Sequence, residues 1–356
     1  MGVSIGIVGG GRFGLMHLRT FAQLRREGLV ERLCLAEVKE DLLAERCRQF
    51  DVQGYSDHRE MLEKADLDAV AVVTPDFLHR RIALDCIAAG RHVLVEKPLD
   101  TTVEGCAAIA DAADAAGVMV MVDFHKRYDP FHIELRESIR RGDLGRPEYG
   151  YAWMEDRIEV PRDWFAKWAA QSSSGWFLGV HMVDLFRWCI GGLNGRRVWA
   201  TGQKHKLPSI GIDAWDAVEA MVEFEQGVTL HLQTAWILPD SFEAVVNQGI
   251  RIVGSEGLSE VDSQDRGARM ASSRGTAGTF NPAFCLEQTG PDGQPRYSGY
   301  GVDSIADFAR HVRLLRGGLS LKDLAGRYAD ARDGLEVTRI VEGMHRSLES
   351  ASIEEL

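Results

Sequence analysis

The 356-residue chain lacks several features that would decide its class at once. No apolar run approaches the length of a membrane-spanning helix, so no membrane association is expected. No basic run or stripe is present and the net charge is −12, which disfavours a nucleic-acid partner. The first strand is expected from residue 3, which leaves no room for a signal peptide, and we expect a cytoplasmic protein.

Metal-binding and disulfide patterns are also missing. The six cysteines form no C-x-x-C pair, and we interpret them as reduced, mostly buried side chains. The eleven histidines form no H-x-x-x-H pair, so no metal site is expected. The contents of hydrophobic residues (45%) and charged residues (26%) are ordinary for a globular protein, and the length suits two domains.

What the chain does have is a glycine motif directly after its first expected strand. Residues 3–8 are apolar and β-prone, and Gly9, Gly11 and Gly14 follow in the pattern G-x-G-x-x-G. Such glycines permit a tight turn, let the backbone approach a pyrophosphate, and let the next helix pack close to the strand. The N-terminus of that helix then offers unpaired N–H groups to the phosphates. The motif predicts dinucleotide binding.

Neighbouring residues support this prediction. Arg12 and Phe13 lie inside the motif and would contact the same cofactor. Glu37 ends the next expected strand, 23 residues after Gly14, where an acid would bind the ribose hydroxyls of the adenosine. Glu37 would also repel the 2′-phosphate of NADP, although Lys39 and Arg12 are near enough to soften that effect. NAD is therefore expected, with NADP possible.

Strands and helices alternate through residues 1–123. The strands are apolar throughout, as in a parallel sheet covered by helices on both faces. We therefore expect an α/β Rossmann domain with a doubly wound parallel sheet. The expected strands are 3–8, 33–38, 69–73, 92–96 and 118–122, and the expected helices are 13–26, 40–50, 57–64, 78–89 and 102–116.

The alternation of strands and helices ends after residue 124. From about 196 to 271 strand follows strand with short turns, which predicts an antiparallel sheet. Two hairpins are expected there, 218–224 with 228–236 and 245–253 with 258–262. The other expected elements are a helix at 128–141, a strand at 147–156, a loop at 157–175, a helix at 176–189, a long loop at 272–300, and helices near 302–316 and 321–348.

Two segments after expected strands carry residues that can do chemistry. Thr74-Pro75 with His79 follows the strand at 69–73, where a loop would contact the cofactor; alternatively, Pro75 begins a helix that Thr74 caps. Glu96-Lys97-Pro98 ends the strand at 92–96, where the amine of Lys97 would lie beside a nicotinamide. Desolvation and the positive ring would both lower the pKa of this lysine, which would allow proton exchange at neutral pH.

A third segment, residues 172–184, opens a helix with small and apolar residues. It places His181 and Asp184 about one turn apart, and His181 could exchange a proton with a substrate hydroxyl. The alternative is a buried histidine bonded to backbone. The preceding residues are rich in aromatic side chains, which could stack on sugar C–H surfaces or pack in the core: Trp164, Trp168 and Trp176.

Together these segments resemble the Gfo/Idh/MocA family, which includes glucose–fructose oxidoreductase and inositol dehydrogenase. The resemblance covers nearly the whole chain, and Glu96-Lys97-Pro98 is its most specific element; His17 also matches a histidine common in the family. It implies a Rossmann domain over 1–123 and a substrate-binding and oligomerisation α+β domain over 124–356. That second domain has an open, mostly antiparallel sheet through which homodimers or homotetramers pair. The C-terminal helix can pack back on the first domain.

The resemblance implies NAD(P)-dependent oxidation or reduction of a sugar, an inositol or a sugar-derived carbonyl. By that resemblance Lys97 is the catalytic lysine and His181 the second proton-transfer group. Two positions depart from the family pattern. Phe177 stands where many members have an aspartate one turn before the histidine, and it is expected at the substrate. His125 stands where asparagine is frequent, and it is expected to line the nicotinamide pocket with Glu96 nearby.

Three functions remain open from the sequence. The first is a dehydrogenase acting on a secondary hydroxyl of a sugar or cyclitol. The second is a redox-neutral oxidoisomerase or lyase that recycles a bound NAD. The third, motivated by Phe177, is a non-catalytic NAD-binding sensor, although a sensor has no need of Lys97.

Overall fold

The computed structural model describes residues 2–262, 269–272, 275–279 and 281–356, with side chains outside 263–280. The chain forms two compact units, Met1–Tyr128 with Ala283–Leu335 and Asp129–Pro282 with Glu336–Leu356. The expected domains, 1–123 and 124–356, differ from these units because residues 283–335 join the first unit. Helix α10 (Ala331–Ser350) begins in the first unit and continues into the second.

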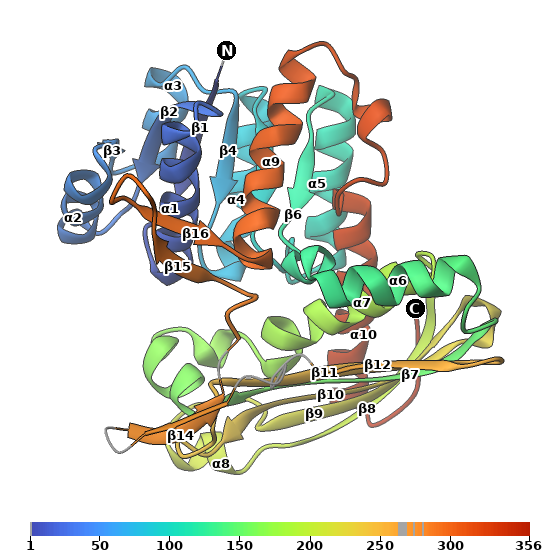
Figure 1. Cartoon of the computed structure of the whole chain (residues 1–356). Helices are drawn as coiled ribbons and strands as arrows, with labels where there is room; N and C mark the ends of the chain where they lie inside the picture. Colours follow the sequence, from blue (N-terminus) through green and yellow to red (C-terminus); the bar gives the residue numbers. More distant parts are fainter. Residues whose placement is uncertain (1, 263–268, 273–274, 280) are drawn as a thin grey trace. The chain divides into compact units, whose positions relative to one another are not determined.

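The first unit is built on a six-stranded parallel sheet with the order β3-β2-β1-β4-β5-β6 (Figure 1). This is the doubly wound arrangement that the apolar strands predict. The strands are β1 (Val3–Val8), β2 (Val30–Ala36), β3 (Gln53–Tyr55), β4 (Ala69–Val72), β5 (His92–Val95) and β6 (Val120–Val122). The helices are α1 (Arg12–Arg26), α2 (Glu40–Phe50), α3 (His58–Lys64), α4 (His79–Ala88), α5 (Val103–Ala116) and α9 (Tyr300–Arg316).

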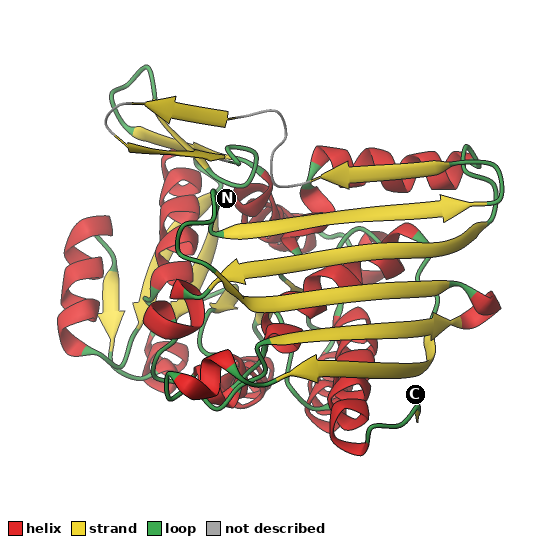
Figure 2. Cartoon of the chain, turned by 90° about the horizontal axis from the view of Figure 1, so that it is seen from below, coloured by secondary structure: helices red, strands yellow, loops and turns green. Residues whose placement is uncertain are grey.

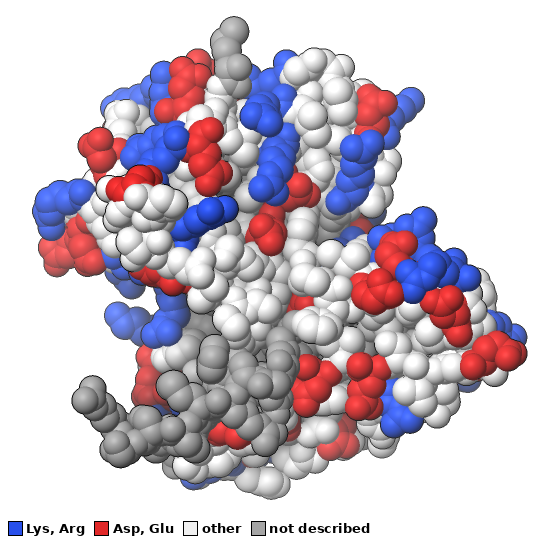
Figure 3. Space-filling model, in the orientation of Figure 1, with Lys and Arg blue, Asp and Glu red and all other residues white. Residues whose placement is uncertain are grey.

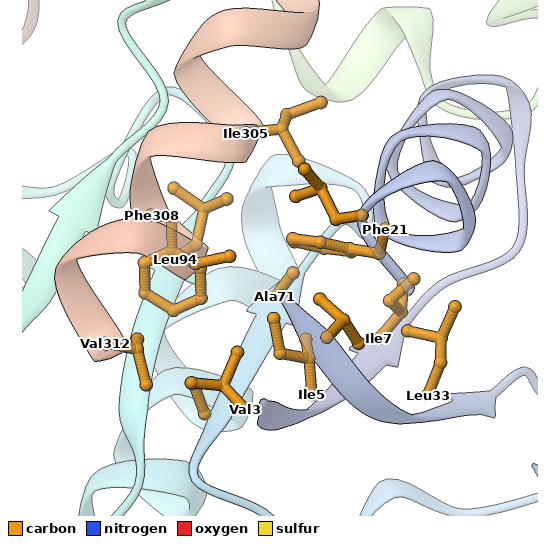
Figure 4. Close-up of a cluster of buried hydrophobic side chains, with 14 of the residues drawn as sticks. Val3, Ile5, Ile7, Phe21, Leu33, Ala71, Leu94, Ile305, Phe308 and Val312 are labelled. Atoms are coloured by element: carbon orange, nitrogen blue, oxygen red, sulfur yellow. The ribbon is translucent and has the colours of Figure 1, made fainter. Parts of the chain in front are cut away.

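Helix α9 completes the core of this unit. Ile305, Phe308 and Val312 of α9 pack with Phe21 of α1 over the apolar side chains of β1 (Figure 4). All of these side chains are buried, so each contributes about 1.5–3 kcal/mol of burial free energy. The segment 283–335 is therefore part of the nucleotide-domain core.

The second unit is built on a seven-stranded sheet with the order β12-β11-β7-β10-β9-β8-β17 (Figure 2). Neighbouring strands are antiparallel except for the parallel pair β7 and β10. Both expected hairpins are confirmed. The strands are β7 (Pro147–Arg157), β8 (Gly195–Gln203), β9 (Ala217–Phe224), β10 (Thr229–Leu238), β11 (Val246–Gly254), β12 (Leu258–Asp262) and β17 (Glu354–Glu355). The helices are α6 (Pro130–Arg141), α7 (Val180–Cys189), α8 (Lys206–Ser209) and the greater part of α10.

Two expectations about local structure are corrected, and one strand was not expected. Residues 272–300 are not one long loop, because β15 (Leu286–Thr289) pairs with β16 (Pro295–Ser298), and β14 (Gly275–Thr279) pairs with β13 (Arg269–Ser272). Residues 273–274 and 280 of this range lie outside the described residues. The helix expected at 321–348 is interrupted: a 3₁₀ turn covers Leu321–Leu324, and α10 starts only at Ala331. The short strand β3 was not predicted, since its three residues carry no apolar pattern.

Among the described residues, no helix combines the length and the apolar character that crossing a bilayer requires. On the face drawn in Figure 3, acidic and basic side chains are interspersed.

Candidate functional site

The glycine loop between β1 and α1 has two glycines that the fold requires and one that it does not. Gly9 has a φ of +105°, and a Cβ there would overlap the carbonyl of Val73. A Cβ on Gly14 would overlap the carbonyl oxygen of Gly9. At Gly11 the φ is −65° and a Cβ would meet nothing within 4 Å. Packing therefore explains Gly9 and Gly14, and the open space at Gly11 fits a phosphate group approaching the start of α1.

Glu37 lies beside this loop at the carboxyl end of β2. Its Oε2 accepts a hydrogen bond from the Gly10 N–H at 2.7 Å, and its Oε1 accepts one from the Lys39 N–H at 2.9 Å. Glu37 is 9% exposed. Each oxygen keeps a second lone pair, so Glu37 can fix the loop and still accept from a ribose hydroxyl.

Thr74 and His79 connect the loops that follow β4 and β5. The two ring nitrogens of His79 lie 2.7 Å from the Pro98 carbonyl oxygen and 2.8 Å from the Thr74 carbonyl oxygen. The alternative role of Thr74, as the cap of a helix that begins at Pro75, is not observed, because Pro75 precedes a 3₁₀ turn and α4 starts at His79. The Thr74 hydroxyl is instead buried without a hydrogen-bond partner among the described residues, as expected of a group that meets a ligand.

Lys97 follows β5, and the Lys97–Pro98 peptide bond is cis. The lysine side chain is 6% exposed, unusual for this residue type. Next to it, the Glu96 Oε1 lies 2.9 Å from the Nε2 of His17, on α1, and the Oδ2 of Asp123, after β6, lies 3.9 Å from the same nitrogen. Elements distant in sequence thus bring an imidazole and two carboxyl groups together at the carboxyl ends of β5 and β6.

The two carboxyl groups differ in electrostatic environment. Burial acts to raise the pKa of Glu96, but the hydrogen bond from His17 and the nearby His17, Lys97 and His125 lower it below its ordinary value. Burial, and then the negative charge of Glu96, raise the pKa of Asp123 well above its usual range. Ligand atoms of His17, Glu96 and Asp123 lie within 4.8 Å of one another. Because His17 and Glu96 already pair and Lys97 supplies positive charge, we assign no metal to these residues.

His125 is packed among aromatic side chains of the first unit. Its ring stacks on Tyr300 with centroids 5.8 Å apart and lies 5.2 Å from the ring of Phe284. Sequence reasoning missed both partners, because Phe284 and Tyr300 lie in the segment interpreted as a long loop. Their signal in the sequence was the presence of aromatic residues within an otherwise Gly-, Ser- and Pro-rich stretch.

In the second unit, the helix that carries His181 starts with a π-helical turn over Gly175–Gly179. Phe177 was expected one α-helical turn before His181, on the same face of the helix. A π-helical turn holds more residues than an α-helical turn, so the side chain of Phe177 points in a different direction relative to His181 than that spacing implies. Phe177 packs in an aromatic cluster, with its ring centroid 4.6 Å from Phe165 and 6.1 Å from Trp236. Trp168 joins this cluster and is only partly buried, as is Trp164.

Trp176 lies outside this aromatic cluster and packs against a histidine of α10. Its ring stacks on His345 of α10 with centroids 5.0 Å apart, and it is 9% exposed. The Nε2 of His345 accepts from the Ser173 hydroxyl at 2.7 Å, while its Nδ1–H donates to the Val341 carbonyl. These contacts favour the packing interpretation for Trp176.

His181 and Asp184 are both buried on α7, 3% and 0% exposed. Lys97 belongs to the first unit and His181 to the second.

Comparisons with known proteins cover both units. Residues 3–124 match the model of the GFO_IDH_MocA oxidoreductase family with an NAD-binding Rossmann fold, and residues 132–260 match the GFO/IDH/MocA C-terminal domain. Myo-inositol 2-dehydrogenase of Thermotoga maritima is 26% identical over 87% of this chain and 88% of that protein. Levoglucosan dehydrogenase of Pseudarthrobacter phenanthrenivorans is 30% identical over 53% of this chain and 51% of that protein, so the match spans about half of its length.

Solved structures share the fold along the whole chain. Scyllo-inositol dehydrogenase from Lactobacillus casei, with bound NAD(H) and scyllo-inositol, has a TM-score of 0.79 at 18% identity, covering 100% of this chain and 99% of that chain. GenD2 from gentamicin A biosynthesis, in complex with NAD, has a TM-score of 0.81 at 23% identity, covering 100% and 96%.

Proposed function

Because this chain belongs to the GFO/IDH/MocA family of NAD-binding oxidoreductases, we propose that it is a dehydrogenase acting on a secondary hydroxyl of a sugar, an inositol or a related polyol. The observation that carries the proposal is Lys97: a nearly buried amine beside an ionised Glu96, at the carboxyl end of a Rossmann strand. NAD held at the glycine loop would supply the acceptor for the hydride on the carbon that bears the hydroxyl, or its donor in the reverse direction.

The residues of this chain then have separate tasks. The N–H groups at Gly11 and Arg12 and the carboxylate of Glu37 bind the cofactor. Lys97 takes the hydroxyl proton, since an amine in this position can exchange protons once desolvated. His181 is a hydrogen-bonding partner to the reacting hydroxyl, and the partly buried rings of Trp164 and Trp168 stack on the C–H face of the substrate. The enzyme works in the cytoplasm, where its six free cysteines stay reduced.

The test is a panel of sugars and cyclitols with NAD and NADP, followed by variants on the best substrate. Lys97→Met is expected to lower turnover by roughly 10²-fold or more while NAD affinity changes only a few-fold. His181→Ala should lower turnover less than Lys97→Met does. Lys64→Met is the matched control, because Lys64 is an exposed lysine paired with Glu60. Near-normal turnover of Lys97→Met would refute the proposal, and product formation without net NADH would show a redox-neutral reaction instead.

A further inference from the structure

The first unit buries two carboxyl groups around one imidazole nitrogen, and both carboxyl groups feel the charge of Lys97. His17 and Asp123 are 0% exposed and Glu96 is 6% exposed. Burying a carboxylate is costly unless it is paired or hydrogen-bonded, and two adjacent carboxylates cannot both be ionised cheaply. The cluster therefore needs a specific distribution of charge.

Geometry decides which acid carries the charge. Glu96 receives a charge-stabilising N–H from His17 at 2.9 Å, whereas Asp123 lies 3.9 Å from the same nitrogen, beyond hydrogen-bond range. Neither Asp123 oxygen meets hydrogen-bond geometry with a described residue, and its nearest polar neighbours are Glu96 and the Ser304 hydroxyl. An anion at Asp123 would be buried next to the negative charge of Glu96, and burial and this charge outweigh the stabilising effect of the Ser304 hydroxyl.

The groups facing these carboxyl groups come from every element packed around them. Helix α1 supplies His17, the end of β5 supplies Lys97, and the residues after β6 supply His125 and Tyr128. Helix α9 contributes the Ser304 hydroxyl, and its Asp307 carboxylate accepts a hydrogen bond from the Tyr128 hydroxyl at 3.0 Å. Lys97 is the one lysine among these groups, and it acts on both carboxyl groups, so its proton affinity depends on the charge that the pair holds.

We propose that His17, Glu96 and Asp123 are positioning residues that set the proton affinity of Lys97, with Glu96 holding a single negative charge and Asp123 kept neutral. One adjacent anion favours the protonated amine enough to offset burial, which disfavours it. Two anions would hold the proton too tightly for a base that must release it in each turnover, and none would leave the amine a weak proton acceptor. The pH dependence that this implies for catalysis rests on the dehydrogenase function proposed above; the charge distribution does not.

The proposal predicts unequal effects of two isosteric substitutions. Glu96→Gln removes the charge, so the pH at which Lys97 takes up a proton should fall by about one unit or more. Asp123→Asn replaces a neutral acid by a neutral amide and should change that pH by only a few tenths of a unit. His17→Leu removes the donor to Glu96 and should shift in the same direction as Glu96→Gln. His17→Gln keeps an amide donor and should stay closer to the wild type.

Titration of Lys97 in the cofactor-free protein tests this directly. The lysines are dimethylated with ¹³C-formaldehyde, the Lys97 signal is assigned by its loss in Lys97→Met, and its chemical shift is followed with pH by NMR. Thermal melting confirms that each variant is folded, and the two His17 variants replace Glu96→Gln if that protein does not fold. The pH profile of kcat/KM on the best substrate is then compared, and its alkaline-rising limb should move with the NMR midpoint.

Equal shifts in Glu96→Gln and Asp123→Asn, or a larger shift in Asp123→Asn, would overturn the proposal. An unmoved Lys97 midpoint in Glu96→Gln and in both His17 variants would do the same. If the midpoints shift as expected but no polyol is turned over, the charge distribution stands and the dehydrogenase function fails. If polyols are oxidised but the Lys97 midpoints do not shift, the dehydrogenase function stands and the proposed charge distribution fails.

Discussion

Gly11 and Gly14 differ in what a methyl group would meet at each position. At Gly11 it meets nothing, whereas at Gly14 it overlaps the carbonyl oxygen of Gly9. Gly11→Ala should therefore leave the cofactor-free protein as stable as the wild type or stabilise it by up to about 1 kcal/mol, because alanine restricts the unfolded chain. Its NAD affinity should still fall at least tenfold, since the methyl group fills the space for the pyrophosphate.

Gly14→Ala is the matched control, and it should lower both the unfolding free energy and the NAD affinity. Urea unfolding and NAD titration by calorimetry measure the two quantities. Unchanged NAD affinity in Gly11→Ala would show that the phosphates do not pass over this residue.

Glu37 has a structural role that the sequence did not reveal. The ribose contact was expected from its position after β2, but the hydrogen bonds to Gly10 and Lys39 depend on loop geometry. Glu37→Ala should weaken NAD binding, raise the NADP/NAD affinity ratio, and cost about 1–3 kcal/mol because two N–H groups lose their acceptor. Glu40→Ala, in the exposed first turn of α2, is the control. A stability loss with an unchanged ratio would leave Glu37 only its structural role.

At the level of elements, periodicity predicted what depends on repeated local contacts. The buried strands β1, β4 and β5 and both hairpins of the second unit were found because apolar residues and turn residues specify them locally. Sequence also marked Lys97 and the glycine loop. It did not predict that His17, Glu96 and Asp123 converge, because their proximity depends on the packing of α1 against the sheet. The π-helical turn before α7 likewise has no pattern of its own in Gly175–Gly179.

His345 of α10 is hydrogen-bonded to Ser173, just before the turn that precedes α7. Protonation of this histidine should change the free energy of unfolding. Burial lowers the pKa of His345 below 6.5, so the unfolded chain binds a proton that the native state does not. The contribution of this group is complete above about pH 6.5 and is lost as the pH falls below it, by at most about 1.4 kcal/mol per pH unit. Lowered pKa values of His92 and His311 act in the same direction.

His345→Gln keeps an acceptor for the Ser173 hydroxyl but does not titrate. Its unfolding free energy should therefore fall less than that of the wild type between about pH 7.5 and about pH 5.5. Urea unfolding at the two pH values measures this difference, and an identical loss in both proteins would contradict the burial argument.

At the scale of the whole molecule, one face of the second sheet has large exposed apolar side chains. Trp199, Met221, His231 and Tyr151 stand in one cross-strand row over β8, β9, β10 and β7, and Tyr151 stacks on His231 with centroids 5.1 Å apart. Tyr151 is 54% exposed and Trp199 44%. We propose that a second copy of the chain covers this face, as a two-fold sheet-to-sheet contact.

Replacing two residues of this row, Tyr151→Asp with Trp199→Glu, should convert the assembly to monomers in sedimentation velocity. Phe131→Asp is the control, because Phe131 is an equally exposed apolar residue on α6. A monomeric wild type, or an assembly unaffected by the double substitution, would exclude this face as the interface.

Residues 283–335 belong to the first unit although they are synthesised after most of the second. Since Ile305, Phe308 and Val312 belong to the same core as β1 and α1, a ribosome that has released only the first 130 residues has produced an incomplete hydrophobic core. The nucleotide-binding half, although encoded first, should become resistant to protease only after α9 emerges. Arrested nascent chains ending near residue 200 should thus be digested in this half, and chains with residues 1–335 outside the exit tunnel should be protected. Folding of this half should therefore wait for residues that are synthesised much later in the chain.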